Sequence, residues 1–476
     1  MNYGDTTFMM LATSMVCLMT PGLAFFYGGL ARKRSVLYIM MQSFISMGIV
    51  TLIWIYGGFG LAFGRDMGGV IGNISDYFGL AHVGLVPSNV HAASIPFILF
   101  FAFQLMFCVI TVPLMSGAFA ERLNMKGYIW LLIVWTILIY IPVSHWIWGG
   151  GFLDKLGFVD FAGGTVIHTT AGFAALSAIF VLGRRNQDNI AMQPSNLMAA
   201  AVGTGLLWFG WFGFNSGGAL KAGQLAATAF SNTFIGLASG MVTWMIYARI
   251  VRGKVNFVDV LTGSVAGLAT ITPVAGYIEP QKAIIVGIVA GIICNLALSF
   301  QEKRGWDDAL GVWGVHGVGG FTGTILIGLL ADKEVNQVSA SAHQLLVQVG
   351  GVALVAIYSF VVTFIIFKVL RVASWKNHIP DYNPEDFDQK QKRLSKMISN
   401  SCREEVTHIV MIIANFLPIL LPIFLSGVNF WLLFWLSVLG GIIDLMFILK
   451  QRYNRPRMVK AFHSQESQRK EFYMNN

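Results

Sequence analysis

The segment DFAGGTVIHTTAGFAAL (160–176) decides the fold, because it is an apolar, glycine-rich run that places one histidine, His168, where a membrane helix would be deepest. A second segment, GVWGVHGVGGFTGTILIGLL (311–330), also holds a single histidine, His316, among glycines. Residues three, four and seven apart share one face of a helix, so each histidine lies on a stripe of small residues. Such a stripe lets another helix approach closely, or leaves a narrow path for a small molecule past the imidazole.

Composition identifies the class of protein. Of the 476 residues, 55% are hydrophobic and 12% are charged, and the mean hydropathy is +0.66. The apolar residues form runs of roughly 18 to 28, the length that crosses a bilayer as a helix. The sequence therefore predicts an all-α polytopic membrane protein and not a barrel. Because the start, MNYGDTTFMM, has an acid and no basic residue, we expect no cleavable signal peptide.

The cysteines and the net charge exclude other classes. The four cysteines lie singly along the chain, and they are Cys17, Cys108, Cys294 and Cys402. This spacing predicts neither a disulfide framework nor a zinc site, and we expect no metal, no other cofactor, no catalytic residue and no enzymatic activity. The net charge of +9 comes mostly from basic loops and a basic tail, so it calls for no nucleic-acid partner.

The apolar runs predict thirteen membrane helices in all. The expected ranges are 7–30, 36–63, 95–117, 127–147, 162–182, 197–214, 226–248, 258–277, 283–300, 311–330, 344–371, 406–425 and 429–449. The two histidine helices are the fifth and the tenth, so units of five helices enter the bilayer from opposite sides. This order predicts an inverted five-plus-five repeat in which the histidines meet near the membrane midplane.

Lysine and arginine gather in alternate loops, which predicts the orientation of the chain. One set of connections holds Arg32, Lys33, Arg34, Arg122, Lys126, Arg184, Arg185, Arg249, Arg252, Lys254, Lys303, Arg304, Lys368 and Arg371. The opposite set holds only Arg65, Lys155, Lys221, Lys282 and Lys333. We expect a multi-pass protein of the cell membrane with its N-terminus outside and its C-terminus in the cytoplasm.

Aromatic residues and one acid mark the outer ends of several helices. Asp160 precedes the helix of His168 and is well placed to cap it. The sixth helix ends in LLWFGWFGFNSGGAL, which brings Trp208, Trp211 and Phe214 to the outer boundary. By itself this end is equally typical of an interfacial aromatic belt.

Six motifs resemble the ammonium transporter family, which comprises the Amt, Mep and Rh proteins. They are TPGLAFFYGG (20–29), FQLMF (103–107) with GAFAER (117–122), SHWIWGGG (144–151), DFAGGTVIH (160–168), FGWFGFNSG (209–217) and DDALGVWGVHGVGG (307–320). The resemblance covers roughly residues 5–371. It implies an eleven-helix transporter fold, commonly a homotrimer with one pore through each subunit, and ammonium or ammonia as the substrate.

The resemblance also implies roles for single residues. Phe107 and Phe214 correspond to a stacked aromatic gate, and Trp148 corresponds to the aromatic wall of an outer ammonium site to which Phe107 also belongs. Asp160 corresponds to an aspartate that orders this outer site. His168 and His316 correspond to twin histidines that line the pore and relay a proton.

General chemistry favours the same mechanism. Ammonium and potassium are similar in size and charge, but only ammonium can lose a proton. Aromatic faces hold a cation by cation–π attraction, whereas an apolar pore opposes the entry of any ion. Desolvation therefore favours deprotonation, so neutral ammonia crosses the pore while two imidazoles share the proton left behind.

The sequence departs from the family pattern in two places. Gly218 stands where the family commonly has a serine, so the outer site lacks a hydroxyl unless Ser216 or a backbone carbonyl replaces it. After Arg371 nothing resembles the tail that links many bacterial members to PII signal proteins, so a PII-type regulator is not expected.

Four alternatives remain at this stage. Two buried histidines could clamp a haem in a membrane cytochrome. They could bind zinc, although no third ligand lies at matching depth. They could merely bridge two helices. The same fold could also serve as an ammonium sensor that signals through its C-terminal extension.

The C-terminal extension is expected to form separate segments. Residues 1–371 form the transporter domain, 372–405 a polar cytoplasmic linker, 406–449 a transmembrane hairpin and 450–476 a basic cytoplasmic tail. Asp444 lies inside the second hairpin helix, and an acid at that depth either reaches the interface or avoids lipid by facing protein. We expect the hairpin to dock on the transporter core or on a partner membrane protein as a regulator.

Overall fold

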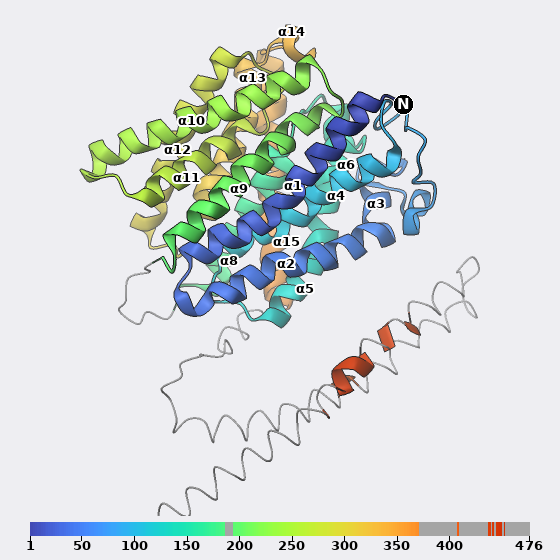
Figure 1. Cartoon of the computed structure of the whole chain (residues 1–476), viewed down its shortest axis with the longest axis horizontal. Helices are drawn as coiled ribbons and strands as arrows, with labels where there is room; N and C mark the ends of the chain where they lie inside the picture. Colours follow the sequence, from blue (N-terminus) through green and yellow to red (C-terminus); the bar gives the residue numbers. More distant parts are fainter. Residues whose placement is uncertain are drawn as a thin grey trace, which may run out of the picture. The chain divides into compact units, whose positions relative to one another are not determined.

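The structure is a computed structural model of the whole chain (Figure 1). It describes residues 1–185 and 194–370, and in the C-terminal part residues 407–408, 437–438, 440–441, 444–449 and 452. The chain divides into two compact units, Met1–Pro380 and Asp381–Asn476. The site described below lies within the first unit.

Helices make up most of the first unit. Those of its first half are α1 (Tyr3–Leu30), α2 (Val36–Ile53), η2 (Trp54–Gly58), α3 (Phe59–Phe63), α4 (Phe97–Ser116), α5 (Met125–Trp135), η5 (Thr136–Tyr140), α6 (Ile141–Trp148), η6 (Gly164–Thr169) and α8 (Thr170–Leu182). Those of its second half are α9 (Leu197–Ser216), α10 (Gln224–Arg252), α11 (Phe257–Ile271), α12 (Pro280–Arg304), η8 (Trp313–Gly317), α13 (Val318–Leu330) and α15 (Ala342–Val369).

Short elements connect these helices. They are η1 (Lys33–Ser35), β1 (Asp66–Met67), β2 (Ile71–Gly72), η3 (Ile74–Asp76), η4 (Phe78–Leu80), α7 (Phe152–Lys155), η7 (Gly217–Ala219) and α14 (Lys333–Asn336). The two strands pair antiparallel, with Asp66 opposite Gly72. They form a small hairpin in the loop after α3.

Ten helical segments among the described residues are long and apolar enough to cross a membrane. They confirm the prediction of an all-α polytopic protein. α11 is also apolar but has only 15 residues, so the predicted range 258–277 was too long. Its helix ends at Ile271 because Pro273 follows closely, and proline cannot continue a helix. The predicted hairpin 406–425 and 429–449 lies almost wholly outside the described residues.

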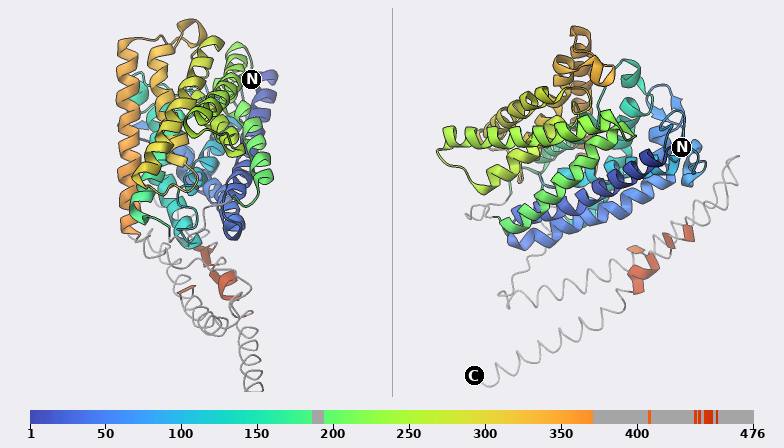
Figure 2. Two further views of the ribbon diagram at one scale, coloured as in Figure 1. Left: turned by 90° about the vertical axis from the view of Figure 1, so that its left-hand side faces the viewer. Right: turned by 45° about the horizontal axis from the view of Figure 1, so that its top comes forward.

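Small residues bring α1 and α9 together, and Figure 1 shows the two helices side by side. A Cβ atom on Gly29 would lie 2.4 Å from the backbone nitrogen of Ala200, and one on Gly203 would lie 2.2 Å from that of Phe26. Only glycine allows backbones to approach this closely. The left view of Figure 2 shows α15, in orange, along one side of the first unit.

The two histidine segments are built alike. Each begins with a π-helical turn, η6 or η8, and continues into an α-helix of 13 residues, α8 or α13. An acid precedes each turn: Asp160 accepts from the amide of Thr165, five residues on, and Asp308 accepts from that of Trp313, also five residues on. This correspondence agrees with the predicted repeat.

The glycine stripes of the two segments face each other. A Cβ atom on Gly172 would lie 2.1 Å from the Cα atom of Gly317, and one on Gly320 would lie 2.3 Å from the carbonyl oxygen of Gly164. Of the two uses that the sequence allowed for these stripes, the structure shows the close approach of helices. That approach brings the two imidazoles together.

Ion pairs link the loops at both ends of the helix bundle. On the side of the β-hairpin, Asp66 forms an ion pair with Lys155. The other carboxylate oxygen of Asp66 lies 2.9 Å from the Nε2 atom of His145. The hydrogen bond from Lys155 lowers the pKa of Asp66 to about 2, so this acid stays ionised. At the opposite end, beyond the last turn of α4, Arg122 and Arg185 pair with Asp307.

The described residues of the second unit include one polar pair. The Nδ1 atom of His408 lies 2.6 Å from a carboxylate oxygen of Asp444, and Asp444 is buried. Of the two positions that the sequence allowed for Asp444, the structure shows the one that faces protein. The predicted linker 372–405 and most of the tail 450–476 lie outside the described residues.

Candidate functional site

A cavity of about 380 Å³, named the outer cavity after the orientation that the sequence predicts, lies beside the end of α3 and the loop that follows it. Its lining consists of Phe63, Val90, His91, Phe100, Phe103, Gln104, Phe107, Ile147, Trp148, Asp154, Phe158, Val159, Asp160, Phe161, Ala162, Gly218, Ala219, Leu220, Leu225, Tyr277 and Asn336. Aromatic rings predominate, with a few carboxylate and amide groups between them. This lining is typical of a site for a small cation.

Asp160 organises the inner wall of this cavity. Its two carboxylate oxygens accept four backbone N–H groups at 2.7 to 3.1 Å, those of Gly163, Gly164, Thr165 and Val166. Burial raises the pKa of Asp160, and the four N–H bonds work in the opposite direction because they stabilise the carboxylate. The predicted cap is therefore present.

Asp160 also fixes Trp148. The indole nitrogen of Trp148 donates to the backbone carbonyl of Asp160 at 2.8 Å, which sets the plane of the indole beside the cavity. The ring of Phe107 lies 6.0 Å from that of Trp148. The structure thus brings Trp148, Phe107 and Asp160 to one cavity.

Phe107 and Phe214 separate the outer cavity from a second one. Their ring centroids are 4.4 Å apart, and the rings meet edge to face. Phe107 lines the outer cavity, whereas Phe214 lines an inner cavity of about 10 Å³. A volume of this size admits about one water-sized molecule.

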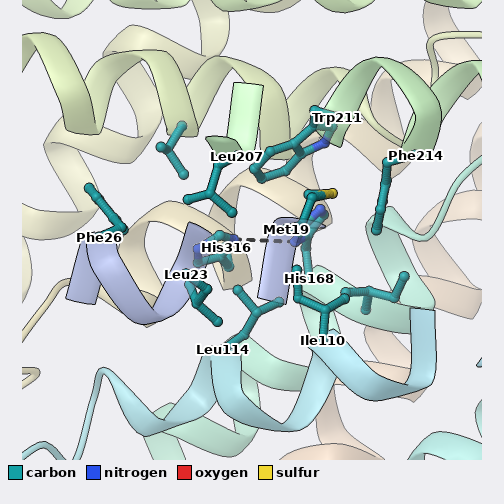
Figure 3. A pocket seen from close by; sticks show the side chains of 12 residues that line it. Met19, Leu23, Phe26, Ile110, Leu114, His168, Leu207, Trp211, Phe214 and His316 are labelled. Atoms are coloured by element: carbon teal, nitrogen blue, oxygen red, sulfur yellow. Dashed lines mark hydrogen bonds between the residues drawn. The ribbon is translucent and has the colours of Figure 1, made fainter. Parts of the chain in front are cut away.

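The inner cavity surrounds the histidine pair (Figure 3). Its other lining residues are Met19, Leu23, Phe26, Ile110, Leu114, Ile167, Leu207, Trp211, Phe214 and Val265. The Nδ1 atoms of His168 and His316 are 3.2 Å apart, and their rings stack at 5.2 Å. Among the described residues the Nε2 atom of His168 has no hydrogen-bond partner. Apart from the Trp211 indole nitrogen, which donates to the hydroxyl of Thr272, the two imidazoles are the polar groups of a mostly apolar lining.

Comparison with known proteins agrees with this geometry. The family model described as Ammonium Transporter Family matches residues 7–377. The chain belongs to the ammonium transporter family. A putative ammonium transporter of Methanothermobacter thermautotrophicus is 45% identical over 78% of this chain and 94% of its own length. The ammonium transporter of Bacillus subtilis is 41% identical over 78% of this chain and 93% of its own length.

Solved structures share the fold of this ammonium transporter. The crystal structure of Candida albicans Mep2 has 33% sequence identity and a TM-score of 0.75, and the match covers 80% of this chain and 87% of that one. A structure titled Sensor Amt Protein has 30% identity and a TM-score of 0.72 over 77% of this chain. The protein is thus a multi-pass transporter of ammonium and, over the matched range, not an enzyme. The transporter names of the relatives do not favour the sensor alternative.

A second family model matches the end of the chain. Its description is glycosyl-4,4'-diaponeurosporenoate acyltransferase, and it matches residues 359–464. The match begins within α15 and therefore overlaps the ammonium transporter model over residues 359–377. It includes both residues of the pair His408 and Asp444.

Two sequence-based interpretations of this ammonium transporter are wrong. Trp211 and Phe214 do not form an interfacial belt, because both are buried and line the inner cavity. His168 and His316 cannot clamp a haem between them, because their facing nitrogens are within hydrogen-bond distance of each other. The rotation of α9 that turns these aromatic rings inward follows from its packing on α1, which the aromatic pattern alone did not reveal.

Gly218 lines the outer cavity of the transporter, but the structure leaves no room there for a side chain. A Cβ atom on Gly218 would lie 2.6 Å from the backbone oxygen of Phe161, so any side chain there requires a shift of the backbone. Ser216 does not line the cavity, and its hydroxyl donates to the carbonyl of Phe212. Ser216 therefore does not replace the missing hydroxyl.

Sequence reasoning missed several polar residues of the outer cavity, of which Gln104 and His91 bear most directly on cation binding. Gln104 is 8% exposed, and its side-chain oxygen has no partner among the described residues. Its signal was a lone amide in the apolar run FFAFQLMF. His91 comes from the long loop after α3 and stacks on Phe97 and Phe100. Burial lowers the pKa of His91, so it adds no positive charge against a cation at neutral pH.

Proposed function

We propose that this transporter binds ammonium in the outer cavity, removes a proton there and passes ammonia along the histidine pair. One observation carries the proposal: an aromatic cavity with a buried aspartate is separated by Phe107 and Phe214 from an apolar cavity that holds His168 and His316. A cation is favoured in the first cavity and opposed in the second.

In this mechanism each group has a distinct task. Trp148 and Phe107 offer ring faces to the cation, and Asp160 holds the Trp148 indole by its backbone carbonyl while its carboxylate contributes negative charge. Gln104 offers an acceptor oxygen. Phe107 and Phe214 act as the gate, and movement of their rings opens the way between the cavities.

Selectivity against potassium follows from chemistry and not from size. Potassium cannot shed its charge, so it meets the full desolvation penalty in the inner cavity, several kcal/mol or more at mid-membrane. Ammonium avoids the penalty by deprotonation. His168 and His316 can carry the released proton because one Nδ1 atom donates while the other accepts.

The orientation, membrane and assembly form part of the proposal. The excess of Lys and Arg in alternate loops supports an outer N-terminus, an outer aromatic cavity and a cytoplasmic C-terminus in the cell membrane. Family resemblance supports a homotrimer. The extent of the family resemblance supports a transporter domain over residues 1–371 and a separate extension beyond it.

Purified full-length protein in liposomes on a solid-supported membrane tests the mechanism. Pulses of ammonium should give a current, and equal pulses of potassium should give none above the signal of empty liposomes. A potassium current equal to that of ammonium would contradict selectivity by deprotonation.

A chain that ends near Lys396 tests whether the extension regulates transport. If its assembly, its ammonium current and its response to nitrogen status all match those of the full chain, the extension has no regulatory role.

We also propose that the C-terminal extension transfers acyl groups. The match of residues 359–464 to an acyltransferase family supports this second function, and so does the His408–Asp444 pair within it. The ammonium transporter model ends at residue 377, so it leaves most of the residues matched by the acyltransferase model uncovered. Incubation of membranes that contain the full chain with a labelled acyl thioester tests it, and formation of a labelled lipid ester is the expected result.

A further inference from the structure

The second unit contains a histidine held by a carboxylate within predicted membrane helices. The Nδ1 atom of His408 is 2.6 Å from an oxygen of Asp444. Phe447, three residues after Asp444, stacks on the imidazole at 4.7 Å with the ring planes 5° apart. The His408 ring is therefore fixed from two sides, by a hydrogen bond at its edge and by a ring on its face.

This contact determines which nitrogen of His408 can accept a proton. A carboxylate only accepts hydrogen bonds, so the Nδ1 atom of His408 carries the hydrogen. In the neutral ring the lone pair then belongs to Nε2. The side chain of His408 is 21% exposed, whereas that of Asp444 is 8% exposed. The arrangement is that of a general base with its orienting acid.

A purely structural role would also place such a pair between helices. Ionisable groups within membrane segments are expensive to bury, so each one calls for a function or a partner. Two features favour a function here. The pair lies inside a match to an acyltransferase family, and acyl transfer to a hydroxyl requires a base of this kind.

We infer that His408 is the catalytic base of this acyl transfer and that Asp444 is its positioning residue, an inference that rests on the second proposed function. The description of the matched family supplies the acceptor class, a sugar hydroxyl of a glycosylated lipid, and the donor considered for this transfer is an acyl thioester. Nε2 of His408 takes the hydroxyl proton as the oxygen forms a bond to the thioester carbon. The carbon–sulfur bond then breaks, and the same proton passes to the departing thiolate. An ester and a free thiol result.

The two products of this acyl transfer separate between the bilayer and the water phase. The acceptor and the ester product stay in the bilayer, whereas the released thiol is soluble. Both products can be measured in one reaction.

Liposomes with the full-length protein, radiolabelled palmitoyl-coenzyme A and octyl β-glucoside as the acceptor provide the test. The variants are His408→Ala, Asp444→Asn, Asp444→Glu and, as a matched control, His343→Ala at an exposed site in α15. Labelled ester and free thiol are measured, and ammonium currents report that each variant is assembled. Loss of a general base lowers the rate by about 100-fold or more.

The expected result is that His408→Ala loses ester formation, that added imidazole restores part of it, and that His343→Ala has no effect. Asp444→Asn should lower kcat with little change in the KM for the thioester, and Asp444→Glu should recover part of the loss. A merely structural pair would not respond to imidazole. If the unaltered chain makes no ester, the second proposed function fails. If it makes ester and His408→Ala does so equally, only the assignment of His408 fails.

Discussion

The Nδ1 atoms of His168 and His316 face each other at 3.2 Å in an apolar cavity. A hydrogen bond between two ring nitrogens requires one N–H and one lone pair, so the neutral pair shares a single proton across this contact. The Nε2 atom of His168 has no other partner among the described residues. Each imidazole can thus pass a proton to the other without moving its helix.

Replacement of either histidine by alanine should therefore stop proton transfer through the pore while ammonia still crosses. We expect the ammonium current of His168→Ala or His316→Ala to fall by about 100-fold, the lower end of the effect of a positioned proton-transfer group. Ammonia itself should still cross, which a pH-sensitive dye inside the liposomes would detect. His343→Ala is the control. Unchanged currents and potassium exclusion in both single variants would contradict the relay.

The Phe107–Phe214 contact predicts a loss of selectivity when it is opened. Phe214→Ala should join the outer and inner cavities and admit water beside the histidines, because Phe214 lines the inner cavity and meets Phe107 at 4.4 Å. Water in the joined cavity lowers the desolvation penalty that excludes potassium. We expect a measurable potassium current in solid-supported membrane recordings. Phe212→Ala is the matched control, since Phe212 lies two residues earlier on α9 and stacks on Phe230 instead. Equal behaviour of the two variants would contradict the gate.

Sequence patterns predicted the helices and the histidine pair because both depend on local features. Runs of apolar residues fix the spans, and the recurrence of one histidine among glycines in the fifth and tenth helices identifies the pair. The position of Asp160 before the glycines of η6 predicted its cap, which the structure confirms.

Other features depend on contacts between distant segments, so the sequence could not supply them. The burial of Trp211 and Phe214 follows from the rotation of α9 against α1, and a belt of lipid-facing rings has the same sequence pattern. His91 reaches the outer cavity from a loop without periodicity. His408, the partner of Asp444, lies 36 residues away in the sequence, and the periodicity of the two apolar runs does not predict this pairing.

Asp160 and Asp308 should differ in their importance for stability. Both oxygens of Asp160 accept backbone N–H groups, whereas one oxygen of Asp308 has no partner among the described residues. An asparagine can keep only one acceptor oxygen, so Asp160→Asn leaves two buried N–H groups unpaired at about 1–3 kcal/mol each. Thermal unfolding in detergent should show a larger loss for Asp160→Asn than for Asp308→Asn. Equal losses would contradict this account of the cap.

Gln104 should contribute to the affinity for ammonium. Its oxygen is buried, has no partner among the described residues and lines the outer cavity. A hydrogen bond to a charged group contributes about 1.5–3 kcal/mol, so Gln104→Leu should raise the half-saturating ammonium concentration by about tenfold or more. Gln42→Leu is the control, because Gln42 also has a buried, unpartnered oxygen but does not line the cavity. The same shift in both variants would assign the effect to packing.

Gly218 offers the sharpest test of the missing hydroxyl, provided that two substitutions are compared. Serine and alanine place the same Cβ atom 2.6 Å from the Phe161 oxygen, so both impose the same backbone shift. Only serine adds an acceptor for the bound cation. Relative to Gly218→Ala, Gly218→Ser should therefore lower the half-saturating ammonium concentration by about tenfold, as a charge-assisted hydrogen bond requires. Identical values for the two variants would mean that another acceptor of the outer cavity, such as the unpartnered oxygen of Gln104, already serves the cation.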